Sequence, residues 1–115
     1  MIYTSYFSNW RNFPEDSYVI GVTRYPPEHI ENWSQLAPSE TLLRQYKNHQ
    51  IDDFMFSVKY QEWLESIVNK RTYQKLLKEL QTQYKNIILC CYETKQEFCH
   101  RHILANWLDM DIKEL

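Results

Sequence analysis

Glycine is almost absent from this chain, because Gly21 is the only one among 115 residues. The phosphate-binding loops of P-loop proteins and of dinucleotide-binding proteins need several glycines at fixed spacing, since the backbone approaches the phosphates closely. Neither loop can form here. The sequence therefore excludes two large classes of nucleotide-binding enzymes.

An excess of basic charge is also lacking, with 13 Lys and Arg against 15 Asp and Glu and a formal net charge of −2. This balance argues against an extended nucleic-acid surface. No apolar stretch approaches the roughly 20 residues needed to cross a bilayer, and the stretch MIYTSYFSNWRNF lacks the basic and apolar regions of a signal peptide. We therefore expect a cytoplasmic protein with no membrane partner.

Cysteine is sparse as well: Cys90, Cys91 and Cys99 are the only three. An odd count with two adjacent members does not indicate a disulfide framework, which fits a reducing cytoplasm. Cys90 and Cys91 face opposite sides of their strand and read as ordinary buried residues. The chain length predicts one domain, residues 1–115, and the 43% content of hydrophobic residues is enough for a core.

Strands are predicted at 2–7, 17–25 and 86–92, with a short edge strand in 110–115. The second strand ends at Pro26-Pro27, and a loop follows through Trp33. Helices are predicted after Pro38-Ser39, over 51–68, around 73–84 and over 99–108. Strands separated by helical crossovers indicate an α/β fold: a single three-layer domain with a small, largely parallel sheet flanked by helices, Rossmann-like but without the glycine-rich loop.

Four stretches carry a family resemblance: IYTSYF, the strand ending in TRYPP, LAPSETLLRQYK and LCCYETKQEFCHRHILANWL. In this order they resemble the Domain of Unknown Function (DUF) 488 family, small α/β proteins of bacteria, archaea and phages. The most specific element is a strand ending in Cys-Tyr-Glu followed by Cys-His-Arg at the start of a helix. The resemblance implies the same fold and a site at these motifs, but no reaction. Members often carry a serine or another residue where His102 stands, so His102 receives less weight than Cys99, His100 and Arg101.

The residues of that site are expected to converge. Open α/β sheets bind ligands at the carboxyl ends of their strands, where helix N-termini point free N–H groups into the crevice. The predicted strand ends and helix start place six side chains at this rim: Tyr6, Arg24, Glu93, Cys99, His100 and Arg101. Arg24 would lie at the opposite rim if the second strand were antiparallel to the third.

Anion binding is the first chemistry that these residues suggest. A helix N-terminus favours negative charge, and Arg24 and Arg101 would add donors suited to phosphate or carboxylate. Tyr6 and Glu93 complete the expected ligand site, with Glu93 orienting Arg101. In the alternative, Arg101 pairs with Glu93 or Glu97 and only pins the loop.

Nucleophilic catalysis is the second. A cysteine at a helix N-terminus beside His100 and Arg101 is expected to have a lowered pKa, so Cys99 is the candidate nucleophile and His100 the acid–base candidate. In the alternatives, Cys99 packs the turn and His100 lies at the core margin. A zinc site of Cys91, Cys99, His100 and His102 is disfavoured, because residues two apart on a helix point in different directions. No metal or cofactor is expected.

Two functions follow from these readings, and the sequence leaves open whether the protein is an enzyme. The first is a pocket for a small anionic ligand, a nucleotide or another phosphorylated compound, on which catalysis can be built. The second is a non-catalytic interaction protein, for example a phage accessory or inhibitor protein, that binds a protein partner through aromatic loops containing Trp10 and Trp33.

Overall fold

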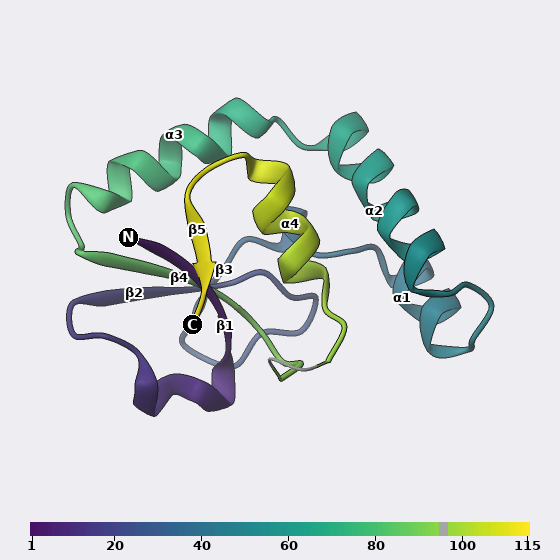
Figure 1. Cartoon of the computed structure of the whole chain (residues 1–115), viewed down its shortest axis with the longest axis horizontal. Helices are drawn as coiled ribbons and strands as arrows, with labels where there is room; N and C mark the ends of the chain where they lie inside the picture. Colours follow the sequence, from purple (N-terminus) through teal and green to yellow (C-terminus); the bar gives the residue numbers. More distant parts are fainter. Residues whose placement is uncertain (95–96) are drawn as a thin grey trace.

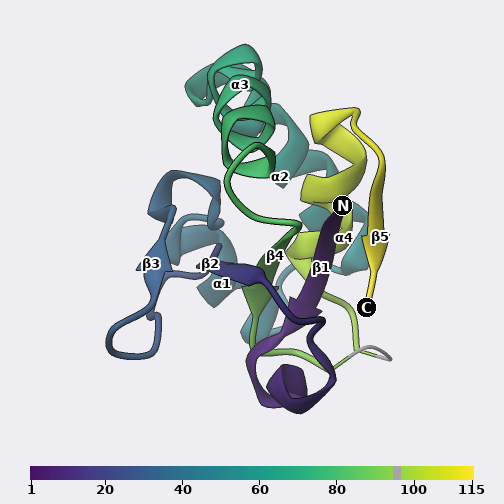
Figure 2. The ribbon, with the colours of Figure 1, turned by 90° about the vertical axis from the view of Figure 1, so that its left-hand side faces the viewer.

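A single parallel sheet organises the part of the chain that the computed structural model describes, residues 1–94 and 97–115 (Figures 1 and 2). Its five strands follow the order β3-β2-β4-β1-β5. Their bounds are β1 Ile2–Tyr6, β2 Ser17–Gly21, β3 Glu31–Asn32, β4 Asn86–Cys91 and β5 Ile112–Glu114. β4 lies at the centre, and its residues 87–91 are all buried, as expected for a continuous apolar run in a parallel sheet.

Side-chain caps start three of the four α-helices in the described part of the chain. α1 (Glu40–Lys47), α2 (Asp53–Ile67) and α3 (Lys70–Gln81) begin after Ser39, Asp52 and Asn69, and each of these caps accepts a hydrogen bond from a first-turn N–H. α4 (His100–Leu108) begins after Cys99, which makes no such bond. Two short 3-10 helices, η1 (Phe7–Asn12) and η2 (Ser34–Leu36), complete the elements.

The α-helices and η1 lie on opposite faces of the sheet. Figure 1 shows α3 and α4 on one side of the strands and η1 on the other. On the α-helical side, Ile20, Ile87 and Leu89 pack with Leu77 and Leu104 in one apolar core. The prediction of one α/β domain with a parallel sheet is confirmed. No described helix is long and apolar enough to cross a membrane.

The second strand is shorter than predicted, and the predicted loop after it contains a strand. β2 ends at Gly21 instead of Tyr25, at the residue where its pairing with both β3 and β4 stops. The side chain of Asn32 takes over beyond that point: its amide donates to Thr23 O at 2.8 Å and accepts from Thr23 N at 3.2 Å. Gly21 is required beside it, since a Cβ there would meet Asn32 Oδ1.

The chain leaves the neighbouring strands β1 and β4 in opposite directions. From β1 it passes through η1 to β2 on one side, and from β4 it passes through α4 to β5 on the other. β1 and β4 are neighbours, with Tyr6 beside Cys91 at their carboxyl ends. This is a topological switch point, where open α/β sheets form a crevice for ligands.

Candidate functional site

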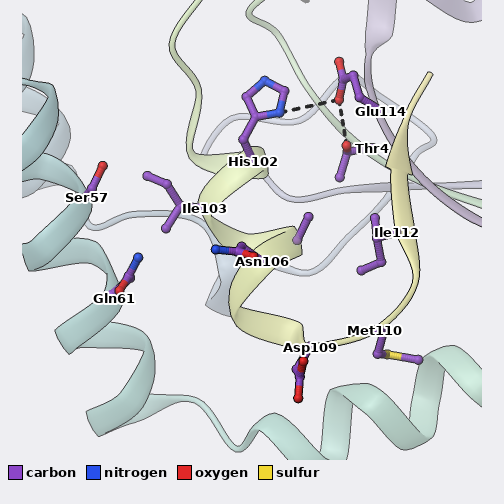
Figure 3. A pocket seen from close by; sticks show the side chains of 11 residues that line it. Thr4, Ser57, Gln61, His102, Ile103, Asn106, Asp109, Met110, Ile112 and Glu114 are labelled. Carbon is purple, nitrogen blue, oxygen red and sulfur yellow. Dashed lines mark hydrogen bonds and ion pairs between the residues drawn. The ribbon is translucent and has the colours of Figure 1, made fainter.

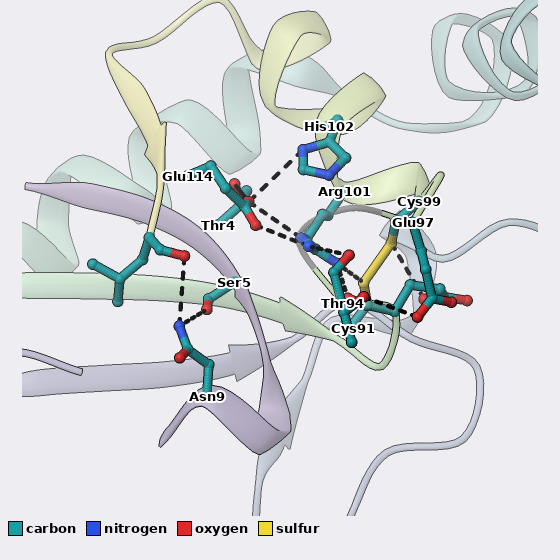
Figure 4. A network of polar contacts seen from close by, with 12 residues as sticks. Thr4, Ser5, Asn9, Cys91, Thr94, Glu97, Cys99, Arg101, His102 and Glu114 are labelled. Atoms are coloured by element: carbon teal, nitrogen blue, oxygen red, sulfur yellow. Dashed lines mark hydrogen bonds and ion pairs between the residues drawn. A yellow bond between two sulfur atoms is a disulfide. The ribbon is translucent and has the colours of Figure 1, made fainter. Parts of the chain in front are cut away.

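Two cysteines meet at the switch point. Cys91 is the last residue of β4, and Cys99 immediately precedes α4. Their sulfur atoms are joined in a disulfide (Figure 4). Cys91 is fully buried and Cys99 is 3% exposed, so this centre lies just beneath the surface.

His100 turns one ring nitrogen towards Cys99. Its Nε2 lies 2.5 Å from the backbone oxygen of Val22, and its Nδ1 lies 3.7 Å from Cys99 Sγ. Burial lowers the pKa of His100 to about 4, with a smaller contribution from the nearby Arg101 charge, so the ring is neutral at pH 7. A carbonyl oxygen can only accept a hydrogen bond, which places the proton on Nε2 and a lone pair on Nδ1.

Glu93 contributes its carboxylate to the same sulfur. Its Oε2 lies 3.3 Å from Cys99 Sγ, whereas its backbone oxygen accepts a hydrogen bond from Arg101. The sequence suggested that the Glu93 carboxylate orients Arg101. The structure assigns that contact to the Glu93 backbone and directs the carboxylate to the thiol centre.

Arg101 is held entirely by the protein. Its guanidinium is fully buried, and all five of its N–H groups have partners. Nε and Nη2 bind the two carboxylate oxygens of Glu114 at 3.2 and 2.8 Å, Nη1 binds Glu93 O at 2.5 Å and Cys91 Sγ at 2.9 Å, and Nη2 also binds Thr94 O at 3.2 Å. Arg101 therefore braces the loop after β4, with Glu114 as its ion-pair partner instead of Glu93 or Glu97.

Tyr6 and Arg24 lie at the same rim of the sheet. Arg101 stacks over the Tyr6 ring at 5.7 Å. β2 runs parallel to β4, so Arg24 is on the site's side of the sheet, and its guanidinium donates to the backbone oxygens of Ala37 and Pro38 at 3.0 to 3.3 Å. Among the described residues, no carboxylate lies within ion-pair distance of Arg24.

Aromatic side chains border this rim. The Tyr92 hydroxyl donates to the backbone oxygen of Tyr25 at 2.6 Å, and the rings of Tyr92 and Phe7 lie 5.0 Å apart. Tyr92 and Tyr25 are 50% and 66% exposed. Their rings are available for stacking with a planar ligand.

Sequence reasoning did not find Glu114, and it took Cys91 as an ordinary buried residue, whereas the structure joins Cys91 to Cys99. The alternation of side chains along a strand separates Cys90 from Cys91, but only the pairing of β4 shows that Cys91 is the one facing α4. Cys90 is buried on the other side, and burial raises the pKa of its thiol to about 12. Glu114 has no local signal, since it reaches Arg101 only through the pairing of β5 with β1.

Once the Cys91–Cys99 disulfide is reduced, the donor atoms of these two cysteines and His100 form a set that could hold a metal ion. They lie within 4.8 Å of one another, and two thiolates with an imidazole are typical zinc ligands. His102 is outside this set. Its Nδ1 instead lies 3.7 Å from Glu114 Oε1, on the other side of Arg101.

His102 borders a separate pocket of about 500 Å³ between α4, α2 and β5 (Figure 3). Its polar lining comes from Thr4, Ser57, Gln61, His102, Asn106 and Glu114, among others. Thr4 donates to Glu114 at 2.6 Å and so fixes the carboxylate at the pocket's edge. None of the residues expected at the site lines this pocket.

The two loop tryptophans have different surroundings. Trp10 is 62% exposed and lines an apolar hollow of about 640 Å³ with Phe7 and Phe13 on the η1 side of the sheet. Trp33 packs against the Tyr73 ring at 5.4 Å and donates to Glu31 at 3.1 Å. Trp10 is therefore an exposed side chain, whereas Trp33 is half-buried.

Comparison with protein-family models matches residues 2–111 to DUF488-N3a, described as the "Active DUF488-N3 subclade". The match spans all three cysteines, Arg24 and all of α4. No curated protein and no solved structure matches the chain.

Proposed function

The chain belongs to the DUF488 family, and we propose that it is a thiol-dependent enzyme whose nucleophile is Cys99. In this proposal His100 accepts the proton of the Cys99 thiol. The substrate is a small anionic compound, a nucleotide or another phosphorylated molecule, that binds at the carboxyl ends of β1, β2 and β4.

The contact between His100 and Cys99 carries the proposal. The ring has its lone pair at Nδ1, 3.7 Å from Cys99 Sγ, because Nε2 is committed to Val22. A cysteine activated by an adjacent base is the common arrangement in thiol enzymes. In the reduced protein the Cys99 proton therefore has two acceptors within reach, Glu93 Oε2 at 3.3 Å and His100 Nδ1 at 3.7 Å, and we assign the role of base to His100.

The start of α4 supports the thiolate that results. Cys99 makes no side-chain cap, so its sulfur is not used to close the helix. The unpaired N–H groups and dipole of a helix N-terminus lower the pKa of a cysteine placed there. Burial lowers the pKa of His100 while the neighbouring sulfur carries no charge. Once Cys99 becomes a thiolate, its negative charge stabilises a protonated His100 ring and so helps that ring to keep the proton.

Arg24 is the proposed anchor for the anion. The Arg24 guanidinium donates to two backbone oxygens, and no described carboxylate neutralises its positive charge. Arg24 also lies two residues after Val22, whose backbone oxygen contacts His100. Arg101 is not proposed to bind the anion, since all its N–H donors bind protein atoms. It is proposed to hold Glu93 and Thr94 in position after β4. The exposed rings of Tyr25 and Tyr92 suit a nucleobase.

Alkylation of reduced protein tests the nucleophile. We expect iodoacetamide at pH 7 to modify Cys99 faster than Cys90, and His100→Gln to slow that modification, with peptide mapping identifying the labelled cysteine. Glutamine can still donate to Val22 but cannot accept a proton. An unchanged rate at Cys99 in folded His100→Gln would remove His100 from this role. His29→Gln, at a fully surface-exposed histidine, is the matched control.

A protein-interaction function is the second candidate, favoured by the exposure of Trp10 over an apolar hollow. Exposed tryptophans beside apolar pockets are frequent anchors of protein partners. Under this function, Trp10→Ala abolishes capture of a partner that wild type retains, whereas Cys99→Ser leaves capture unchanged. The opposite dependence supports the thiol enzyme.

A further inference from the structure

We propose that Cys91 is the resolving thiol of Cys99, so that a small hydroperoxide converts the pair reversibly from two thiols to a disulfide. The inference rests on the proposed function in taking Cys99 as the reactive thiol. It adds a substrate class, hydroperoxides, and a role for Cys91 that nucleophilic catalysis by Cys99 does not require.

The position of Cys91 carries the inference. Its sulfur lies against that of Cys99 (Figure 4), although one belongs to a central strand and the other to a helix start. Arg101 Nη1 donates to Cys91 Sγ at 2.9 Å. A guanidinium at this distance stabilises a thiolate, so Cys91 is prepared both to attack an oxidised Cys99 and to leave when the disulfide is reduced.

Cys90 offers an internal contrast. It neighbours Cys91 in the same strand but points to the opposite face, and burial raises the pKa of its thiol to about 12. It has no sulfur partner, and the Arg101 charge lowers its pKa by less than burial raises it. The chain therefore carries one inert and two reactive thiols.

The reaction balances in two steps. The Cys99 thiolate attacks a hydroperoxide, forming an S–O bond and breaking the O–O bond. The sulfur is oxidised to a sulfenic acid, and the departing oxygen leaves as an alcohol, or as water from hydrogen peroxide, with a proton from the solvent that replaces the one Cys91 releases when it forms its thiolate. The Cys91 thiolate then attacks that sulfur, the S–S bond replaces the S–O bond, and the hydroxyl leaves as water with a proton from His100. A dithiol reductant restores both thiols and becomes a disulfide itself.

Access to the centre favours a small oxidant. Cys99 is 3% exposed and Cys91 is fully buried, so a small oxidant reaches the Cys99 sulfur with less rearrangement of the fold than a large one needs. Hydrogen peroxide is neutral and about the size of water.

The test starts from protein reduced with dithiothreitol, desalted and treated with equimolar hydrogen peroxide. We expect wild type to lose two of its three thiols, to lose the mass of two hydrogen atoms, and to give a peptide pair joined through Cys91 and Cys99. Dithiothreitol should reverse all three changes. Cys90→Ser should behave as wild type does.

Variants separate the two steps. Cys91→Ser, or Cys91→Ala if the serine variant does not fold, should form no disulfide and should leave a sulfenic acid at Cys99 that dimedone traps, whereas wild type gives only a trace of this adduct. Cys99→Ser should not react. A Cys91 variant whose Cys99 is neither oxidised nor trapped, or a wild-type disulfide that involves Cys90, overturns the proposal.

Two further outcomes keep the hypotheses apart. If Cys91→Ser retains the fast alkylation of Cys99 but wild type forms no disulfide, the resolving role fails and the proposed nucleophile survives. If wild type forms the disulfide while His100→Gln alkylates normally, the proposed general base fails instead. One equivalent of zinc in purified wild type, lost in both Cys91→Ser and Cys99→Ser and protecting the thiols from peroxide, would identify a metal centre and overturn the resolving role.

Discussion

Arg101 and Glu114 form a bidentate ion pair that links α4 to β5. Nε and Nη2 of the guanidinium bind the two carboxylate oxygens at 3.2 and 2.8 Å. The arginine is fully buried and the glutamate side chain is 17% exposed. The remaining donors of Arg101 hold the loop after β4 and the Cys91 sulfur, so the pair connects β5 to the thiol centre (Figure 4).

Breaking this pair is expected to destabilise the fold. Glu114→Gln leaves the buried Arg101 charge without a counterion, and removing one partner of a buried pair costs about 3 to 5 kcal/mol. Since Glu114 keeps some exposure, we expect a loss near the lower limit, about 3 kcal/mol, measured as the free energy of unfolding in urea.

Glu28→Gln is the control for that measurement. Glu28 lies in a pair with His29 in which both side chains are 94% exposed, and such pairs contribute roughly 0 to 1 kcal/mol. Equal losses in the two variants would show that the Arg101–Glu114 pair adds nothing beyond a surface contact.

Much of the fold could be read from local patterns. The apolar run at 86–92 and the caps at Ser39, Asp52 and Asn69 locate elements through forces that act between neighbours in sequence. β3 could not be found in this way, because two residues carry no periodicity. The end of β2 also depended on a distant residue, Asn32, whose amide replaces the strand's partner.

The location of the candidate site in the fold could be predicted better than the contacts between its side chains. Cys99 and His100 follow from their position at a helix start, and the parallel sheet brings Tyr6 and Arg24 to the same rim. The partner of Arg101 could not be predicted, since Glu114 comes from an edge strand whose neighbour is set by the whole topology. The pairing of Cys91 with Cys99 depends likewise on which face of β4 meets α4.

The buried His100 should make stability depend on pH. Its folded pKa is lowered, by burial first, from 6.5 to about 4, so the unfolded chain binds more protons between these values. Stability is therefore present in full above pH 6.5 and falls as the pH drops towards 4. One pKa unit corresponds to about 1.4 kcal/mol, so the total is on the order of 3 kcal/mol.

Urea unfolding of wild type and His100→Gln at several pH values between 4 and 7 measures this contribution. The difference between the two free energies should shrink as the pH falls, because glutamine does not titrate. Carboxylates that titrate in the same range affect both proteins equally. A difference that stays constant with pH would mean that His100 takes up its proton in the folded state at its ordinary pKa.

Gly21→Ala is expected to destabilise the protein through Asn32. The added methyl group meets Asn32 Oδ1 and displaces the amide that holds Thr23. Overpacking of this kind costs roughly 1 to 3 kcal/mol. In the Asn32→Ala background the same change should cost less, because the obstructing group is gone, and a double-mutant cycle in urea measures the difference. Additive losses would place the clash elsewhere.

Arg24→Ala should remove ligand-induced stabilisation while leaving the fold intact. A ligand that binds only the folded state stabilises it by about 2.7 kcal/mol at a hundredfold excess over Kd, which raises the melting temperature of a domain of this size by several degrees. We expect nucleotides, sugar phosphates or sulfate to give such a shift in reduced wild type and none in Arg24→Ala. Arg71→Ala, at an exposed arginine of α3, should respond as wild type does. Equal shifts in wild type and Arg24→Ala would place the anion at another cation, and no shift in any of the three proteins would favour the interaction function built on Trp10.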